Sequence, residues 1–395
     1  MAIRQEKSKN VFIAWIFAFF CIYGYFNDWM GLPQINMLDE GACILLVLYS
    51  MKNIDIYKNK EVRMPLCILV AYLFYSLIFG RNIPKAALHD FLALCKPLFC
   101  MFVAFSFPVK LTGRQKRLFR YFFIALAIYI WTELPVMNVK YSNPGIYYIR
   151  CLTCAMGYLY FSERRKKDWY ITTVILVPGL FCDKSKFFLE FVSIVGVGFF
   201  LSKKITFNLK WITYIAIIMM TGVYLGFEKF EHYFIEADVD SVARTALYYR
   251  SKDVLIDYFP FGSGLGTYAT EGAARYYSPL YAEYGLDGIF GLRKNDYGTE
   301  SDFFKDTFYP SLAQIGVVGV FLFVWFWVRR WNEANLLPLD AYKVAIISIG
   351  VIAVQNVAAD GFTGGVGVTF CTLLGMELSK LATAGKANGN LSDSK

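Results

Sequence analysis

The chain contains 395 residues, of which 57% are hydrophobic and 18% are charged, and its mean hydropathy is +0.42. Soluble domains carry about 25% charged residues, and a single aqueous core could not hide this much apolar surface. The net charge of +9 comes from short Lys/Arg runs between apolar segments, which is typical of membrane topology. Composition therefore excludes a water-soluble nucleic-acid-binding domain and favours an integral membrane protein.

Apolar stretches recur from end to end, and about 20 such residues span the hydrocarbon of a bilayer. Helices satisfy every backbone polar group locally in lipid, and these stretches lack the alternation of barrel strands. We therefore predict an all-α polytopic membrane protein with about a dozen transmembrane helices. The predicted spans are 11–27, 35–51, 64–80, 86–107, 121–137, 146–161, 169–182, 187–201, 211–227, 307–328, 342–359 and 362–379.

The positive charges predict how the chain is oriented in the membrane. Lys and Arg gather in alternate connections, while the short connections between them hold few, and the positive-inside rule then places both termini in the cytoplasm. The N-terminal apolar run is expected to be an uncleaved first span because no small-residue cleavage site follows it. The predicted domains are a bundle at 1–227, an external loop domain at 228–306, a second bundle at 307–380 and a disordered tail at 381–395.

Ionisable side chains inside the predicted spans are costly in lipid, so each is expected to pair or to have a functional role. They are Asp39, Glu40, His89, Asp90, Lys96, Arg150, Glu190 and Asp360. The first four lie near span ends, where snorkelling or pairing is an equally good explanation. Arg150 and Lys96 lie deeper, and each needs an anion, which is either a neighbouring carboxylate or a bound phosphate.

The nine cysteines lie mostly inside apolar segments and are interpreted as small core residues. Cys151 and Cys154 form a CxxC, but they lie within an apolar helix and no second pair accompanies them. We therefore favour a structural role for them over a metal or redox role.

The external loop contains an amphipathic helix, predicted at 241–258, that carries two arginines. Arg244 and Arg250 are six residues apart, which places them about 120° from each other around a helix. They would therefore flank a ligand or perform different tasks. The helix is followed by Pro260 and a glycine-rich turn formed by Gly262, Gly264 and Gly266. Such a turn either exposes N–H groups to an anion or is simply a tight turn at the membrane surface.

Two carboxylates, Glu300 and Asp302, precede the tenth predicted span. One of them would serve as a general base that activates a sugar hydroxyl. The alternative is that they cap the following helix, because acidic residues suit a helix N-terminus.

The order of these features resembles the O-antigen polymerase (Wzy-type) and O-antigen ligase superfamily of membrane glycosyltransferases. The resemblance runs from Arg244 through the glycine turn to the Glu300 cluster and then to Gly316 and Gly319. It covers nearly the whole chain in topology, and it implies a GT-C-type fold with one large periplasmic loop between the ninth and tenth spans. The implied activity is polymerisation of polyprenyl-diphosphate-linked oligosaccharide repeat units at the periplasmic face of the bacterial inner membrane.

The resemblance also implies roles for individual residues. The family often shows Ser-Arg where this chain has Ser185-Lys186, which implies that Lys186 binds the diphosphate together with Arg244 and Arg250; Arg150 and Lys184 are weaker candidates. The implied catalytic pair is Glu300 and Asp302. The loop tyrosines that would stack on sugar rings are Tyr248, Tyr249, Tyr276 and Tyr277.

No cofactor or metal is expected, because no external cluster with clear ligand spacing is present. The expected partners are an undecaprenyl-diphosphate-linked glycan as donor and acceptor, and membrane lipid; a chain-length regulator is a candidate partner.

Three other functions remain open. A ligase that transfers glycan to lipid A-core usually carries a histidine where this chain has Glu300, so we favour a polymerase. A transporter would show internal symmetry between its halves and leaves the long loop unexplained. A lipid-sugar flippase would place its critical cations along a central tunnel instead of in the loop.

Overall fold

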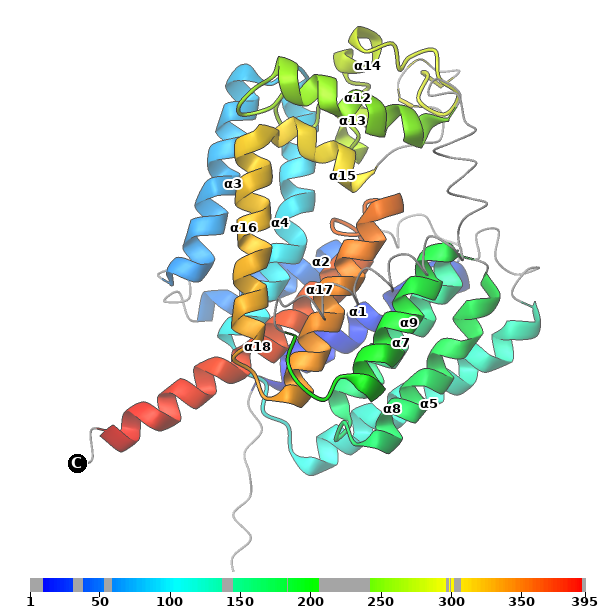
Figure 1. The fold of residues 1–395 in the computed structure, drawn as a ribbon, viewed down its shortest axis with the longest axis vertical. Coiled ribbons are helices and arrows are strands. Elements are labelled where there is room, and N and C mark those ends of the chain that lie inside the picture. Colours follow the sequence, from blue (N-terminus) through cyan, green and yellow to red (C-terminus); the bar gives the residue numbers. More distant parts are fainter. Residues whose placement is uncertain are drawn as a thin grey trace, which may run out of the picture.

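The computed structural model describes residues 10–30, 38–52, 59–136, 145–182, 184–205, 242–295, 298, 300–301 and 307–392. Within these ranges the chain is helical and forms no β-strand, which confirms the predicted all-α class. Figure 1 shows a bundle of helices with a smaller helical region over one end. We call this smaller region, formed by residues 242–295, the cap.

The bundle consists of α1 (Val11–Met30), α2 (Leu38–Ser50), α3 (Lys60–Phe79), α4 (Pro84–Ser106), α5 (Gly113–Glu133), α7 (Gly145–Phe161), α8 (Lys166–Leu176), α9 (Ser185–Phe200), α16 (Gly316–Ala334), α17 (Leu339–Ala358) and α18 (Gly365–Ser392). The cap contains α12 (Ala243–Asp257), α13 (Glu271–Arg275) and α14 (Pro279–Glu283). Short elements include α15 (Phe308–Ser311) and the 3₁₀ helices η3 (Leu134–Val136), η4 (Val177–Cys182) and η6 (Leu312–Ile315).

Among the described residues, 5 helices are long and apolar enough to cross a membrane: Lys60–Phe79, Pro84–Ser106, Gly113–Val136, Phe308–Ala334 and Leu339–Val357. This supports a membrane protein. Of the other described apolar helices, α7 has 17 residues and α9 has 16. The predicted ninth span, 211–227, lies outside the described residues. The dozen spans and the cytoplasmic termini therefore stay predictions.

The predicted span 307–328 is not one continuous α-helix. It starts with α15 and η6, and α16 begins only at Gly316, whose φ of +65° turns the chain. A left-handed conformation of this kind favours glycine, because a side chain there would be strained. The membrane helix therefore enters through a bent segment that lies against the cap.

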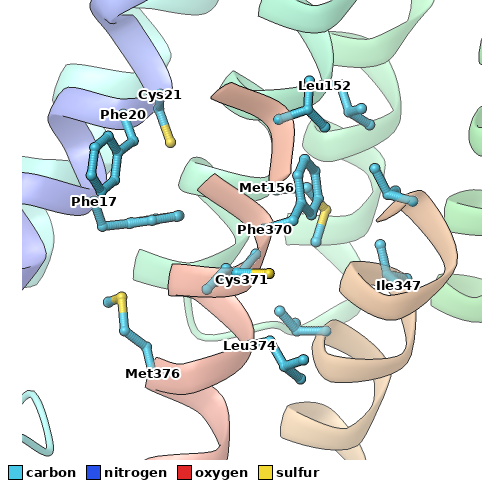
Figure 2. Close-up of a cluster of buried hydrophobic side chains, with 14 of the residues drawn as sticks. Phe17, Phe20, Cys21, Leu152, Met156, Ile347, Phe370, Cys371, Leu374 and Met376 are labelled. Carbon is cyan, nitrogen blue, oxygen red and sulfur yellow. The ribbon is translucent and has the colours of Figure 1, made fainter. Parts of the chain in front are cut away.

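The core of the bundle surrounds α18. This helix is buried continuously from residue 366 to 379, and it packs most extensively against α4 and α17. Figure 2 shows Phe370 and Leu374 of α18 among Phe17 of α1, Met156 of α7 and Ile347 of α17. Interior positions this apolar on all sides are expected for a helix that contacts other helices instead of lipid or water.

The cysteines mostly belong to this core. Cys21, Cys151, Cys154 and Cys371 are buried and free. Cys154 makes only a weak contact, at 3.4 Å, with the carbonyl oxygen of Phe123. These surroundings agree with the structural role predicted for the CxxC.

Gly375 allows α18 to approach α4 closely, because a Cβ atom at this position would overlap the Met101 carbonyl. We expect Gly375→Ala to lower the free energy of unfolding by about 1–3 kcal/mol, as overpacking does in other cores. Thermal unfolding of the purified chain measures the change. Gly350→Ala is the matched control, because nothing lies within 4 Å of its added Cβ. Equal melting temperatures for the two variants would contradict the close approach.

Candidate functional site

The glycine turn anchors the cap to the bundle. Gly262, Gly264 and Gly266 have φ values of +83°, +96° and +75°. A Cβ atom on any of them would overlap neighbouring atoms, which at Gly266 belong to Ala86 of α4. Glycine is therefore required at these positions both for the conformation and for the close approach to α4.

The N–H groups of this turn donate to acceptors within the protein. Gly262 donates to the Tyr258 carbonyl at 2.7 Å, and Gly264 donates to the Gln314 carbonyl at 2.9 Å. Gly266 donates to Asp90 Oδ2 and to Gln314 Oε1, each at 2.9 Å. The geometry therefore favours the tight-turn interpretation over an anion cradle, because these donors are already used.

Asp90 is the bundle residue that binds the turn. It lies near the start of α4 and is 4% exposed. Besides Gly266, it accepts the N–H of Gly272, at 3.1 Å to Oδ1, and the His89 ring lies 3.6 Å from the same oxygen. A buried carboxylate needs such donors, since an unsatisfied one would be strongly destabilising. Asp90 thus has a pairing role, and its partners are backbone groups of the cap.

Lysines at the start of α9 approach the cap helix α12. Lys186 is half-buried in the first turn of α9, and it interacts electrostatically with Arg244 of α12 and with Lys184. Its Nζ lies 5.6 Å from the ring centroid of Tyr148 in α7. Three of the five cations predicted to bind diphosphate therefore gather at one place. We call Lys184, Lys186 and Arg244 the cation cluster.

Arg250 has different surroundings from Arg244. Its guanidinium carbon lies 5.7 Å from the centroid of the Tyr249 ring, and it interacts electrostatically with the buried Tyr268. Tyr268 belongs to the apolar core of the cap, where its hydroxyl donates to the Leu247 carbonyl at 2.7 Å. The sequence predicts that Arg244 and Arg250 either flank one ligand or perform different tasks. The structure favours different tasks, because Arg250 interacts with the interior of the cap.

Arg150 lies 3.5 Å from Glu133, and both side chains are buried. Of the two partners considered for this cation, the neighbouring carboxylate is therefore present. Separating such a pair leaves an uncompensated buried charge, so Arg150 and Glu133 connect α7 to the end of α5. Arg150 is consequently a poor candidate for diphosphate binding.

The four predicted sugar-stacking tyrosines lie in different surroundings. Tyr248 is beside the cation cluster, Tyr249 is exposed, Tyr276 lies 6.4 Å from the His89 ring, and Tyr277 packs 5.6 Å from Tyr281. The Tyr248 hydroxyl donates to the Val357 carbonyl at 2.7 Å, and burial raises its pKa to about 12. Tyr248 is therefore a neutral phenol that connects the cap to the end of α17.

Glu300 is half-buried, and its carbonyl accepts the N–H of Asn295 at 2.8 Å. The next helix, α15, begins at Phe308, and its N-cap is Thr307. Glu300 is thus too far along the chain to cap that helix, so the capping alternative is wrong for Glu300. Asp302 lies outside the described residues.

Sequence reasoning missed a polar network that lies next to Lys186. Glu190 of α9 is 1% exposed, and its Oε1 accepts the Nε2 amide of Gln355 from α17 at 2.8 Å. The Gln355 Oε1 in turn accepts the Tyr148 hydroxyl at 3.2 Å. The available signal was an amide and a carboxylate inside two apolar segments, although nothing in their spacing pairs them.

An apolar cavity lies between α3, α4 and α16, and Ile68, Tyr72 and Leu322 are among its lining residues. Phe308 and Leu312 of the bent segment also line it. Tyr309, which follows Phe308, interacts electrostatically with Tyr248 beside the cation cluster. One short segment therefore has contacts both with the cavity and with the neighbourhood of the cations.

Among the described residues, no group of three His, Cys, Asp or Glu side chains is placed to hold a metal ion. Comparisons with protein-family models, with curated proteins and with solved structures found no match to the chain. The fold and the site geometry therefore define its class on their own, as an α-helical membrane protein with a cap over one end of the bundle.

Replacing Asp90 tests whether this carboxylate anchors the cap. Asp90→Asn loses one acceptor, so we expect a loss of about 1–3 kcal/mol of stability, the usual effect of leaving a buried donor unsatisfied. Limited proteolysis should cleave the cap faster in this variant. Asp287→Asn on the exposed surface of the cap is the control. Equal cleavage rates for both variants would contradict the anchoring role.

Proposed function

We propose that this protein is a membrane-bound glycosyltransferase that polymerises polyprenyl-diphosphate-linked oligosaccharide repeat units into a surface polysaccharide. The observation that carries the proposal is the cation cluster. Lys186 of α9 interacts electrostatically with Arg244 of α12 and with Lys184, which precedes α9, although 58 positions separate Lys186 from Arg244 in the sequence. Positive charges gathered between a membrane bundle and an external cap suit a diphosphate at the membrane surface.

The reaction explains why these charges are needed. A hydroxyl oxygen of the acceptor glycan attacks the anomeric carbon of the donor, and the bond from that carbon to the diphosphate oxygen breaks. The polyprenyl diphosphate leaves with the bonding electrons, so negative charge develops on it in the transition state. Lys186 and Arg244 would stabilise this charge electrostatically, which is commonly the largest single contribution to catalysis.

The hydroxyl proton needs an acceptor, and we assign this role to Glu300 or Asp302. Glu300 is not a helix cap and lies on the segment that connects the cap to α15. Arg250 would act from the interior of the cap, and the exposed Tyr249 offers a face for sugar stacking.

The surroundings of the cluster suit a lipid carrier. Phe308 of α15 lines the apolar cavity between α3, α4 and α16, and the next residue, Tyr309, interacts electrostatically with Tyr248. The cavity would take part of the apolar chain of the carrier, and the cation cluster would take its headgroup. We place the protein in the bacterial inner membrane with the cap in the periplasm and both termini in the cytoplasm. An O-antigen ligase would use the same leaving group, and the identity of the acceptor distinguishes the two activities.

We expect Arg244→Ala to reduce the rate of polymerisation by about 10²-fold or more, as does the loss of one transition-state donor in other enzymes. Cells that carry the variant should accumulate single repeat units on the lipid carrier, measured by mass spectrometry of lipid-linked glycans. Arg275→Ala is the control, since Arg275 is exposed and pairs with Glu271 on the cap surface. Repeat units trapped on the cytoplasmic side would instead indicate a flippase, and normal polymer would remove the role of Arg244.

Glu300→Gln separates a general base from a structural carboxylate. A base should lose roughly 10²-fold or more in rate when it becomes an amide, while membrane insertion and thermal stability stay normal. Polymer length and protein level are measured in the same cells. A variant with full polymer would exclude Glu300 and leave Asp302 as the base.

A further inference from the structure

Lys186 belongs to a closed arrangement of side chains from α7, α9 and α17. The ammonium group lies over the Tyr148 ring, whose centroid is 5.6 Å from Nζ. The Tyr148 hydroxyl donates to Gln355, Gln355 donates to Glu190, and Glu190 interacts electrostatically with Lys186. Glu190 is four residues after Lys186, so the two side chains lie on the same face of α9.

Glu190 has fewer hydrogen bonds than a carboxylate that only connects helices would be expected to have. Oε1 has a hydrogen bond from Gln355, whereas Oε2 is buried without a hydrogen-bond partner among the described residues. A carboxylate used only to hold helices together would be expected to use both oxygens, because an unsatisfied buried acceptor is destabilising. Lys186 is the positive group that interacts with Glu190 and offsets part of the cost of burying its charge.

Lys186 needs this compensation because its other charged neighbours repel it. Arg244 of α12 and Lys184 are both positive. Tyr148 and Gln355 are neutral and cannot balance these charges. The thiol of Cys182 in η4 is a further titratable group nearby, close to Lys184 and Tyr148. A half-buried ammonium group beside two further cations would tend to lose its proton. Without its positive charge, Lys186 could not hold a diphosphate.

We propose that Glu190, Gln355 and Tyr148 are positioning residues that keep Lys186 charged and fixed beside Arg244, so that the cation cluster is ready before the diphosphate binds. This inference rests on the proposed function for its ligand, but the state of Lys186 is a property of the protein alone. The network therefore predicts behaviour that can be measured without any substrate.

The first experiment measures the ionisation of Lys186 directly. The purified full chain in lipid nanodiscs is labelled with an amine-reactive reagent over a range of pH, and labelling at Lys186 is measured by peptide mass spectrometry. Burial lowers the pKa of Lys186; the Glu190 carboxylate opposes this effect, and Arg244 and Lys184 add to it. Glu190→Gln removes the opposing charge, so the labelling midpoint should move to lower pH by about one unit or more.

A second variant tests the same network in case Glu190→Gln fails to fold. Gln355→Leu keeps the Glu190 carboxylate but removes the amide that donates a hydrogen bond to it. Because this hydrogen bond stabilises the ionised form of Glu190, its loss should also move the labelling midpoint of Lys186 to lower pH, by less than Glu190→Gln does. Glu283→Gln is the control, because Glu283 is an exposed carboxylate of the cap that pairs with Arg81. An unchanged midpoint in both network variants would overturn the proposal.

The second experiment connects the network to the ligand. Binding of farnesyl diphosphate, a short polyprenyl diphosphate, is measured against pH for the wild type and for Glu190→Gln. Binding should weaken as the pH rises and Lys186 loses its proton, and this loss should occur at a lower pH in the variant than in the wild type. Adding Lys186→Arg should remove the difference, because arginine stays charged throughout. A double variant that behaves like Glu190→Gln would overturn the positioning role.

The two readouts separate failure of this inference from failure of the proposed function. A wild-type chain that binds no farnesyl diphosphate at any pH would contradict the diphosphate site, and the labelling midpoints would still decide whether Glu190 keeps Lys186 charged.

Discussion

The hydrogen bonds between Asp90 and the glycine turn are the constraint on which the candidate site depends. Asp90 is part of α4, and both of its oxygens accept backbone N–H groups of the cap, from Gly266 and Gly272. This attachment fixes the cap against the bundle, and Arg244 of the cap helix α12 interacts electrostatically with Lys186 of α9. A cap that moved freely would separate the charges that the proposed chemistry needs.

Arg150 and the cation cluster show two different environments of buried charge among the described residues. Arg150 pairs with Glu133, and this ion pair connects α7 to α5. The cation cluster instead combines several positive groups with one incompletely bonded carboxylate, Glu190. Like charges repel strongly where the dielectric is low, so the Glu190 carboxylate lowers the cost of placing Lys186 near two other cations.

Local patterns predicted much of the fold. The apolar runs at 64–80 and 86–107 correspond within a few residues to α3 (Lys60–Phe79) and α4 (Pro84–Ser106), because membrane helices depend mainly on composition and length. The predicted loop helix at 241–258 corresponds to α12, but its buried and exposed faces differ less in hydrophobicity than expected. Ile256 is 70% exposed, while the buried face includes small residues such as Ala243 and Ala246.

The contacts of the site were harder to predict. The glycine turn was recognised, but its spacing did not show that its N–H groups would be used by Asp90 and Gln314, which lie in distant segments. The link between Glu190 and Gln355 joins positions 165 residues apart. Local periodicity contains no information on such pairs, since it reports only which face of a helix is apolar.

The central position of α18 affects how the protein is assembled. This helix occupies the middle of the bundle, yet the ribosome makes it after α1, α4, α7 and α17, the helices that it packs against. Those helices must enter the membrane before their common partner exists, and their facing sides stay in contact with lipid or with the insertion machinery until it arrives. The bundle therefore closes only after α18 has been made, because α18 is the helix that fills the space between the other four.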